Sequence, residues 1–391
     1  MQINNNFQKN ANISMVAQLL WKSPGISRVE IARQLDLYRS TVSNIINTLI
    51  DNGVVFEEKE GESMPQGGRK PICLGLNDKF GCVLGIEVQP SGFHAVVLNI
   101  VGNVIFSKSG GIPELPFDDA LRAILDSLMN EILHLDIPLL GICFALPGII
   151  DSSKGIIIKS DPFHLVNHSC TANLSTRYGV PVFMENDANC LAWLELANNR
   201  GENKRNFICL NAEFHYKDSV FGEQTGMGVG LGIALGGSVF SGSKFAAGEF
   251  FSVSWREGVE GQTGLSPEIM RTLETDKKSF TAWIVDLFSS LVPVVSVLDP
   301  EVVFAHGDIA RHASFVNEIL DSEVPQFRSL LSRSDCELIF GDGSDLSVAS
   351  GAAQMFYLQL FTLPVCSDRD PGTMIEWDAV FSLSTRKVAK N

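Results

Sequence analysis

Polar side chains that can contact DNA bases recur at helical spacing between residues 39 and 47. Arg39 can donate two hydrogen bonds to guanine, and Asn44 can form a paired hydrogen bond with adenine. Ser40, Ser43 and Asn47 follow at spacings of three or four residues, so a helix would place all five side chains on one face. Small polar and cationic groups on such a face can enter the major groove of DNA. The alternative is a protein-docking bundle whose polar face is only solvated.

Three short helices are expected to position this face. Apolar residues repeat at helical spacing from Ile13 to Leu20, and Ser23-Pro24-Gly25 would end this first helix. Ser27 and Glu30 form a capping-box pattern at the start of a second helix. The third helix would bury an apolar stripe made of Val42, Ile45, Ile46, Leu49 and Ile50. Together these elements predict a helix-turn-helix.

A wing hairpin and a cationic linker are expected to follow. Val54-Val55-Phe56 favours a strand, and a polar stretch then leads to Gly68-Arg69-Lys70-Pro71. Arg69 would be able to enter a minor groove rich in A·T pairs, where negative potential is concentrated. We therefore assign residues 1–73 to a winged helix-turn-helix domain with its linker, and residues 74–391 to the body.

The charge of the chain is unevenly distributed. The net charge is −15, which by itself argues against a nucleic-acid partner. Residues 1–75, however, contain 8 Lys and Arg against 7 Asp and Glu, so this part carries +1 and the remainder −16. Because only the docking face must meet phosphates, an acidic body is compatible with DNA binding by the head.

The composition favours a cytoplasmic protein. The longest apolar run, Leu139–Ile150, is too short to span a bilayer, and the N-terminus lacks the apolar stretch of a signal peptide. The cysteines form no CxxC pair and are expected to be buried free thiols; they stand at positions 73, 82, 143, 170, 190, 209, 336 and 366. The seven histidines are dispersed, so we expect no metal site.

Alternation of strands and helices after Leu74 favours an α/β body with two lobes around a cleft. A three-strand meander is expected over residues 82–107, and the lobes would divide near residue 190. Further strands are expected at 139–145, 182–184, 207–212 and 302–305, and a glycine-punctuated hairpin at 228–240. Helices are expected at 118–135, 188–198, 279–298 and 346–360.

The chain resembles the ROK family of repressors, open reading frames and kinases up to about residue 362. In the head the resemblance includes Ser27-Arg28, Glu30, Thr41-Val42-Ser43 and the GGRKP linker, which adds Thr41 to the expected DNA-binding residues. The segments of the body that carry it are Glu185–Asn189, Thr225–Gly232, Gly236, Gly242, Ala247–Glu249 and Ser350–Ala353. The resemblance implies a sugar-kinase-like, actin-like fold related to ribonuclease H behind the winged helix-turn-helix.

The resemblance also implies a sugar site at Asn186, Asp187 and Glu249. In the family's kinases the residue that matches Asp187 removes a proton from a sugar hydroxyl, a step that needs a base. Without any catalysis, the three side chains can also simply accept hydrogen bonds from sugar hydroxyl groups. The alternatives are a helix cap for Asn186 and Asp187 and a solvated loop carboxylate for Glu249.

Two motifs of the family's kinases are altered. Where they have an Asp-x-Gly-Gly-Thr phosphate turn, this chain has Glu87–Gly92, in which Pro90 supplies no amide hydrogen. Near residue 305, a Gly-Gly pair is replaced by Ala305-His306-Gly307-Asp308. The family's Cys₃His zinc site also lacks its ligands, because Ser252 replaces the histidine and Gly258–Leu265 contains no cysteine.

We therefore expect a non-catalytic, sugar-sensing transcriptional regulator without a cofactor, which represses carbohydrate genes. Its partners would be operator double-stranded DNA, a sugar or sugar derivative, and a second copy in a homodimer or dimer of dimers. The alternatives are an active ATP-dependent sugar kinase with an accessory head, and a constitutive DNA-binding factor without a ligand.

Overall fold

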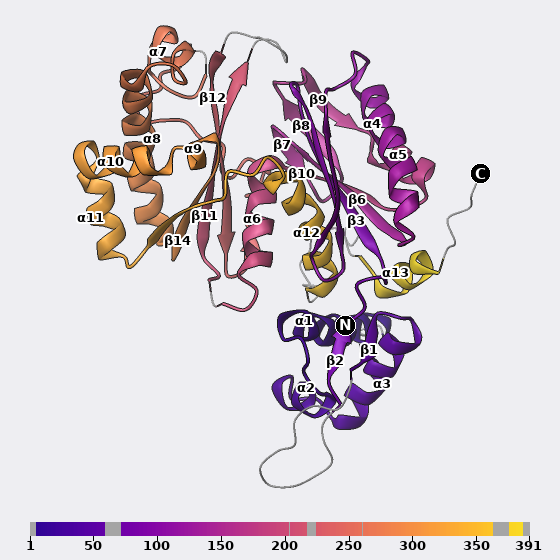
Figure 1. The fold of residues 1–391 in the computed structure, drawn as a ribbon. Coiled ribbons are helices and arrows are strands. Elements are labelled where there is room, and N and C mark those ends of the chain that lie inside the picture. Colours follow the sequence, from indigo (N-terminus) through magenta and orange to yellow (C-terminus); the bar gives the residue numbers. More distant parts are fainter. Residues whose placement is uncertain are drawn as a thin grey trace.

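The computed structural model shows a small head beneath a body of two lobes (Figure 1). It describes residues 5–58, 72–202, 204–216, 224–259, 261–362 and 375–385. The head and the two-lobed α/β body were both expected from the sequence, and the fold class is confirmed.

The head contains three helices and a two-stranded wing. The helices are α1 (Asn5–Lys22), α2 (Arg28–Gln34) and α3 (Arg39–Asp51), and the antiparallel strands are β1 (Val55–Glu57) and β2 (Leu74–Leu76). The expected capping box is present, because Ser27 and Glu30 satisfy each other's backbone amides at the start of α2. Strand β2 lies just beyond residue 73, so the wing includes residues that we had assigned to the body.

The first lobe is built on a five-stranded sheet in the order β10-β6-β3-β4-β5. Its strands are β3 (Cys82–Gln89), β4 (Gly92–Asn99), β5 (Val104–Gly110), β6 (Leu139–Leu146) and β10 (Val182–Asn186). Helices α4 (Phe117–Ile132) and α5 (Thr171–Tyr178) cover one face, and η1 (Leu133–Leu135) extends α4. A smaller sheet contains β7 (Ile149–Asp151), β8 (Ile156–Ser160) and β9 (Leu165–Ser169), which the sequence analysis missed together with α5.

The second lobe has a five-stranded sheet in the order β13-β12-β11-β14-β15. The strands are β11 (Phe207–Tyr216), β12 (Gln224–Leu235), β13 (Ser238–Val239), β14 (Val302–Gly307) and β15 (Glu337–Phe340). Its helices are α7 (Pro267–Arg271), α8 (Lys277–Leu298), α9 (Asp308–Arg311), α10 (Ala313–Glu323) and α11 (Pro325–Arg333). Within the described residues, α8 is long and apolar enough to cross a membrane by length and composition. This corrects the expectation that no segment of the chain could span a bilayer. In this structure Trp283, Leu287 and Leu291 of α8 pack into the core of the second lobe.

Helices α6 (Asp187–Asn198) and α12 (Ser347–Phe361) lie side by side between the two sheets (Figure 1). Small residues allow this close packing. A β-carbon on Gly351 would lie 1.9 Å from the carbonyl oxygen of Cys190, and one on Gly85 would lie 2.0 Å from that of Ala349. Glycine is therefore needed at both positions, where α12 touches α6 and strand β3.

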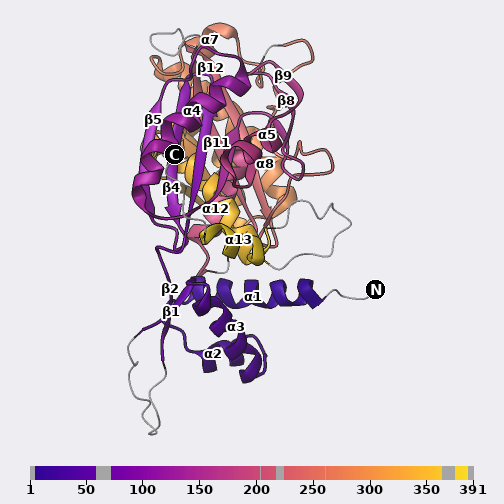
Figure 2. The same ribbon diagram turned by 90° about the vertical axis from the view of Figure 1, so that its right-hand side faces the viewer.

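The head is packed directly on the body through α1 (Figure 2). Trp21 lies against Phe361 at the end of α12, with ring centroids 5.3 Å apart. The guanidinium carbon of Arg200 lies over the Trp21 ring, 4.4 Å from its centroid. Helix α13 (Trp377–Ser384) contacts both α1 and the body, and Trp377 is fully buried. One apolar core continues from the head through α12 and α13.

Candidate DNA-binding face and ligand cleft

The polar face of α3 lies where the sequence analysis expected it. Arg39, Ser40, Asn44 and Asn47 are exposed, while Thr41 and Ser43 are half-buried. The apolar stripe opposite them is buried, except that Ile50 is only partly covered. The helix thus presents hydrogen-bonding groups to solvent because its other side completes the core of the head.

Two residues beside this face were not among the expected DNA contacts. Arg28 donates a hydrogen bond to Asn47 Oδ1 at 2.9 Å and forms an ion pair with Glu57 in the wing at 2.9 Å. It therefore joins α2, α3 and β1. Tyr38, which precedes α3, is 85% exposed, a large aromatic surface next to Arg39. The position of Tyr38 in the turn between α2 and α3 is the feature of the sequence from which this exposure could have been predicted. Arg69 lies outside the described residues.

Asn186 and Asp187 lie where β10 ends and α6 begins. Asn186 Oδ1 accepts a hydrogen bond from the Asn189 amide at 3.1 Å, and Asn186 Nδ2 donates one to the Gly148 carbonyl oxygen at 2.9 Å. Both polar ends of Asn186 are thus engaged, in the helix-cap geometry that the sequence left as an alternative. Its sugar contact stays a prediction, and Asp187 is the stronger candidate.

Asp187 and Glu249 face the same electrostatic environment. Burial and the charge of Glu249 raise the pKa of Asp187 to about 6. Desolvation and the neighbouring Asp161 of the β8–β9 turn raise the pKa of Glu249. Carboxyl groups whose pKa is raised in this way are suited to sugar hydroxyl groups, which can donate to them without adding negative charge.

Gln89 lies in the segment Glu87–Gly92, which stands where the family's kinases have a phosphate turn. Gln89 Nε2 donates to Glu87 Oε1 at 3.3 Å and to Glu213 Oε2 at 3.4 Å, and so joins β3 of one lobe to β11 of the other. Strands β3 and β4 meet at the register pair Gln89 and Gly92, so only Pro90 and Ser91 form the turn. Burial and Glu213 raise the pKa of Glu87 well above its usual value, and burial and Asp187 raise that of Glu213 to about 8.

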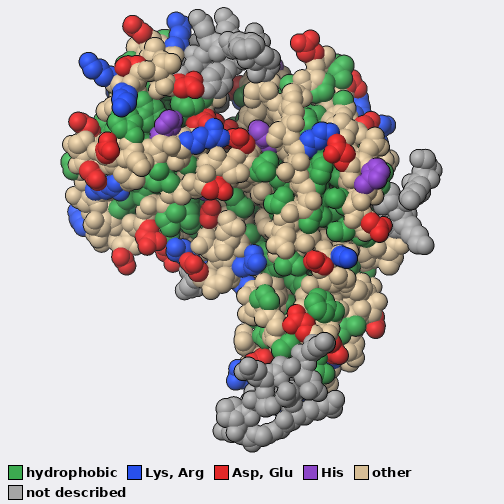
Figure 3. Space-filling view, viewed as in Figure 1, with side chains coloured by type: hydrophobic (Ala, Val, Ile, Leu, Met, Phe, Trp, Pro, Cys, Tyr) green, Lys and Arg blue, Asp and Glu red, His purple; other side chains and the backbone are tan. Residues whose placement is uncertain are grey.

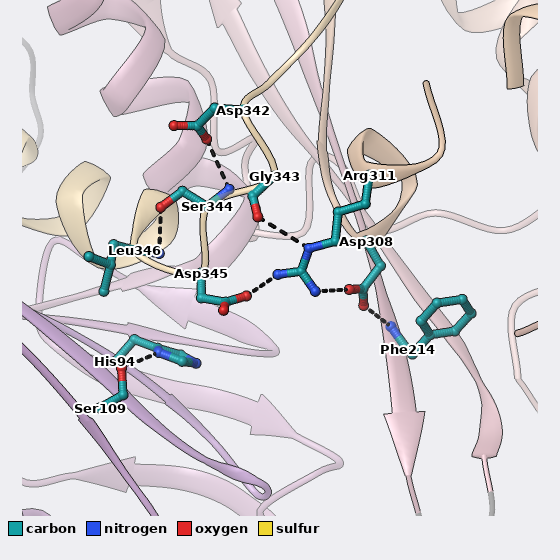
Figure 4. Close-up of polar contacts among 10 residues, drawn as sticks. All are labelled: His94, Ser109, Phe214, Asp308, Arg311, Asp342, Gly343, Ser344, Asp345 and Leu346. Atoms are coloured by element: carbon teal, nitrogen blue, oxygen red, sulfur yellow. Dashed lines mark hydrogen bonds and ion pairs between the residues drawn. The ribbon is translucent and has the colours of Figure 1, made fainter. Parts of the chain in front are cut away.

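A cavity of about 150 Å³ lies next to these side chains. Its acidic lining comes from Glu87, Glu213, Asp308 and Asp345. Arg311 points into the same region and pairs with both Asp308 and Asp345, while also donating to the Gly343 carbonyl oxygen at 3.2 Å (Figure 4). Since the guanidinium is already neutralised by two carboxylates, the cavity would repel the phosphates of a nucleotide.

Both the head and the body of the chain match known protein families. Residues 83–251 match the ROK family, and residues 18–55 match a winged helix-turn-helix DNA-binding family. The chain thus contains a ROK family domain behind a winged helix-turn-helix. It is 31% identical over 248 residues to a protein named xylose repressor from Staphylococcus xylosus, and 30% identical over 245 residues to one from Lactiplantibacillus pentosus.

These ROK relatives are matched over part of their length. The alignments cover 63% and 62% of this chain, and 61% and 59% of the two repressors. A crystal structure described as a ROK family transcriptional regulator, homologous to the Escherichia coli MLC protein, superposes with a TM-score of 0.70 at 16% identity. It covers 97% of this chain and 99% of that chain, which supports the fold of head and body together. A ROK glucokinase from Streptomyces griseus matches 70% of this chain with a TM-score of 0.53 and 17% identity, covering 99% of that structure.

The segment where ROK proteins carry zinc is held here by hydrogen bonds. Gln262 forms two hydrogen bonds with the Val229 backbone, at 2.8 and 2.7 Å, and its carbonyl oxygen accepts from the Ser252 amide at 2.8 Å. Ser254 Oγ accepts from the Gly264 amide at 2.8 Å and lies 2.8 Å from Ser252 Oγ. A side-chain amide thus connects the loop to β12 in the described part of this segment.

Proposed function

We propose that this ROK protein is a cytoplasmic DNA-binding transcriptional regulator that represses carbohydrate genes and senses a sugar without phosphorylating it. The observation that carries the proposal is the docking of a helix-turn-helix with an exposed polar face onto a kinase-like body. The names of the repressor relatives support the same function.

The head has the features needed to read duplex DNA. Its third helix exposes Arg39 and Asn44, whose side chains match guanine and adenine edges in the major groove. The face of the body seen in Figure 3 carries both acidic and basic side chains, but the chain beyond residue 75 has a net charge of −16, whereas residues 1–75 carry +1. The body as a whole would therefore be repelled by DNA. Contacts are therefore expected to be confined to the head, and two heads of a homodimer or dimer of dimers would meet two half-sites.

The cleft supports binding of a sugar more than phosphoryl transfer. Asp187, with a pKa of about 6, is mostly ionised at neutral pH and retains the chemistry of a hydroxyl acceptor or base. A kinase must also hold phosphates by amide groups and cations. Here the corresponding turn contains Pro90, and the adjoining cavity is lined by carboxylates. A sugar therefore remains a suitable ligand, whereas ATP does not.

Helix α12 provides a physical connection between cleft and head. Its first residues, Ser347 and Val348, line the acidic cavity. At its other end the Leu360 carbonyl oxygen accepts a hydrogen bond from Ser14 Oγ of α1 at 2.8 Å. A helix of 15 residues is about 22 Å long. Closure of the lobes on a ligand would thus move α12 and change the relative position of the two heads in a dimer.

The proposal is tested by combining ligand screening with DNA binding. Thermal-shift screening against a sugar panel that begins with xylose should find a ligand that stabilises the protein. Selection from random duplexes should enrich one operator motif, whose affinity changes when that ligand is added. Linkage requires DNA to change ligand affinity by the same factor. Asp187→Ala should abolish the ligand effect while DNA binding without ligand persists.

Each alternative has its own outcome in this experiment. Enrichment of an operator without any sugar response would favour the constitutive DNA-binding factor. ATP-dependent phosphorylation of a sugar, lost in Asp187→Asn, would favour the active kinase with an accessory head. Failure to enrich any DNA sequence would remove the regulator proposal.

A further inference from the structure

Three side chains of the kinds that bind zinc converge in the first lobe, and none of them is among the residues proposed to bind a sugar. One oxygen of Asp118, one ring nitrogen of His168 and the Sγ atom of Cys170 all lie within 4.8 Å of one another. Among the residues that the structure describes, this is the one group of three or more His, Cys, Asp or Glu side chains close enough to hold a metal ion. We propose that Asp118, His168 and Cys170 form a zinc site with three protein ligands.

The three residues are brought together by different elements. Asp118 lies in the first turn of α4, His168 lies in β9, and Cys170 is the residue that precedes α5. Asp118 and His168 are 50 positions apart in sequence, yet Asp118 Oδ1 and His168 Nε2 lie 2.6 Å apart. The fold, and not a local sequence motif, therefore creates this group.

The chemistry of the group matches zinc. Thiolate, imidazole and carboxylate are its usual protein ligands, with bond lengths of about 2.0 to 2.3 Å. In tetrahedral coordination two atoms bound to one zinc ion therefore lie about 3.3 to 3.6 Å apart. The observed spacing requires only small side-chain adjustments. Three ligands would leave one tetrahedral position for water or a further ligand.

The surroundings provide both access and support. The side chains of Asp118 and His168 are each 30% exposed, so an ion can enter from solvent, whereas Cys170 is buried. The rings of His168 and Phe117 are nearly perpendicular, with centroids 5.8 Å apart, and the Phe117 ring also contacts Phe163. Apolar rings around a metal ligand fix its orientation and lower the local dielectric. Bound zinc would pin β9 and the start of α5 to α4.

Cobalt(II) provides a direct test because it takes the place of zinc and reports its ligands by absorption. The full-length, reduced protein is treated with chelator and titrated with cobalt chloride. We expect an equimolar complex with a thiolate-to-cobalt charge-transfer band and the visible bands of tetrahedral cobalt, which zinc chloride then removes. Zinc should also raise the thermal unfolding temperature, because it binds the native state.

Variants decide whether these residues are the ligands. Cys170→Ser should abolish the charge-transfer band, and His168→Asn and Asp118→Asn should each weaken cobalt binding at least tenfold. Cys73→Ser and His164→Asn are matched controls, since His164 is exposed in the turn that leads into β9. They should leave the spectrum unchanged.

The opposite results would overturn the site. No charge-transfer band at equimolar cobalt, or a band that persists in both Cys170→Ser and His168→Asn, means that the group is only a hydrogen-bonded pair beside a thiol. If Cys170→Ser does not fold, the cobalt spectrum of His168→Asn decides the question instead, because His168 is only half-buried. Circular dichroism would verify that this variant is folded.

Discussion

Trp377 Nε1 donates a hydrogen bond to Ser14 Oγ at 3.1 Å, although the two residues are 363 positions apart. Ser14 in turn donates to the Leu360 carbonyl oxygen at 2.8 Å. One buried hydroxyl group thus connects α1 of the head to both α12 and α13. The head is therefore held to the body by packing and hydrogen bonds, and not by the covalent linker alone.

This relationship predicts that Ser14→Ala will uncouple ligand binding from DNA binding. The substitution leaves the buried Trp377 indole without its acceptor, which costs about 1 to 3 kcal/mol. We expect ligand affinity to be retained, while the ligand-dependent change in operator affinity falls severalfold. Calorimetry and DNA titrations with and without the best sugar would measure both quantities. Ser290→Ala is the control, because Ser290 is equally buried but lies in α8; an equal loss of coupling there would contradict the prediction.

The exposed face of α3 predicts which substitutions weaken operator binding. Arg39→Ala and Asn44→Ala should each cost about 1 to 3 kcal/mol and relax the preference at one base pair. Arg333→Ala removes the same charge from exposed α11 in the second lobe and should leave affinity unchanged. Fluorescence titration with the selected operator and single-base variants would test this. A uniform loss across all sequences would instead assign Arg39 to phosphate contacts.

The charged lining of the cavity predicts that ATP binds poorly. Isothermal titration with ATP and magnesium should show no saturation at millimolar nucleotide, because Pro90 supplies no amide hydrogen to a phosphate, the buried carboxyl groups of Glu87 and Glu213 offer no positive charge, and the Arg311 charge is compensated by Asp345. Glu213→Gln removes one of these carboxylates but restores no amide group in the turn, so phosphorylation should remain absent. Tight ATP binding by the unmodified protein would refute this account.

The raised pKa of Glu213 predicts how stability depends on pH. Its pKa is about 8 in the fold, against a reference value of 4.5. Between these values the unfolded chain is ionised at this position while the folded protein retains the proton. The folded state then binds more protons, so the contribution of Glu213 to stability falls as pH rises from about 4.5 to about 8. Glu213→Gln should therefore raise the unfolding temperature at pH 8, and the gain should shrink towards pH 5.

Glu318→Gln provides the control for this experiment. It makes the same chemical change at an exposed position of α10 and should leave the pH dependence unaltered. If Glu213→Gln gives equal stabilisation at pH 5 and pH 8, the effect does not arise from the Glu213 proton.

The loop that lacks the ROK zinc ligands is expected to depend on Gln262. Gln262→Ala removes two hydrogen bonds to the Val229 backbone, worth about 1 kcal/mol each. We expect faster proteolysis between residues 251 and 265 and a loss of about 2 kcal/mol in unfolding free energy. Chelator should not reproduce this effect. A chelator-sensitive loop would mean that metal binds there after all.

The sequence by itself predicted the head and the resemblance of the body to the ROK family. Helix-turn-helix geometry depends on local periodicity and caps, so Ser27, Glu30 and the apolar stripe of α3 were sufficient to predict it. The loss of the phosphate turn and of the zinc ligands was equally visible, because neither the amide of Pro90 nor the missing cysteines can be restored by folding. Short elements such as β7, β8 and β9 escaped detection since their periodicity is too brief to stand out.

Only the tertiary structure decided which distant groups meet. It placed Gln89 between Glu87 and Glu213 of opposite lobes, and packed α1 on α12 and α13. It also brought Asp118 to His168 and Cys170. None of these contacts follows from spacing along the chain, because each depends on how sheets and helices bury their apolar faces against one another.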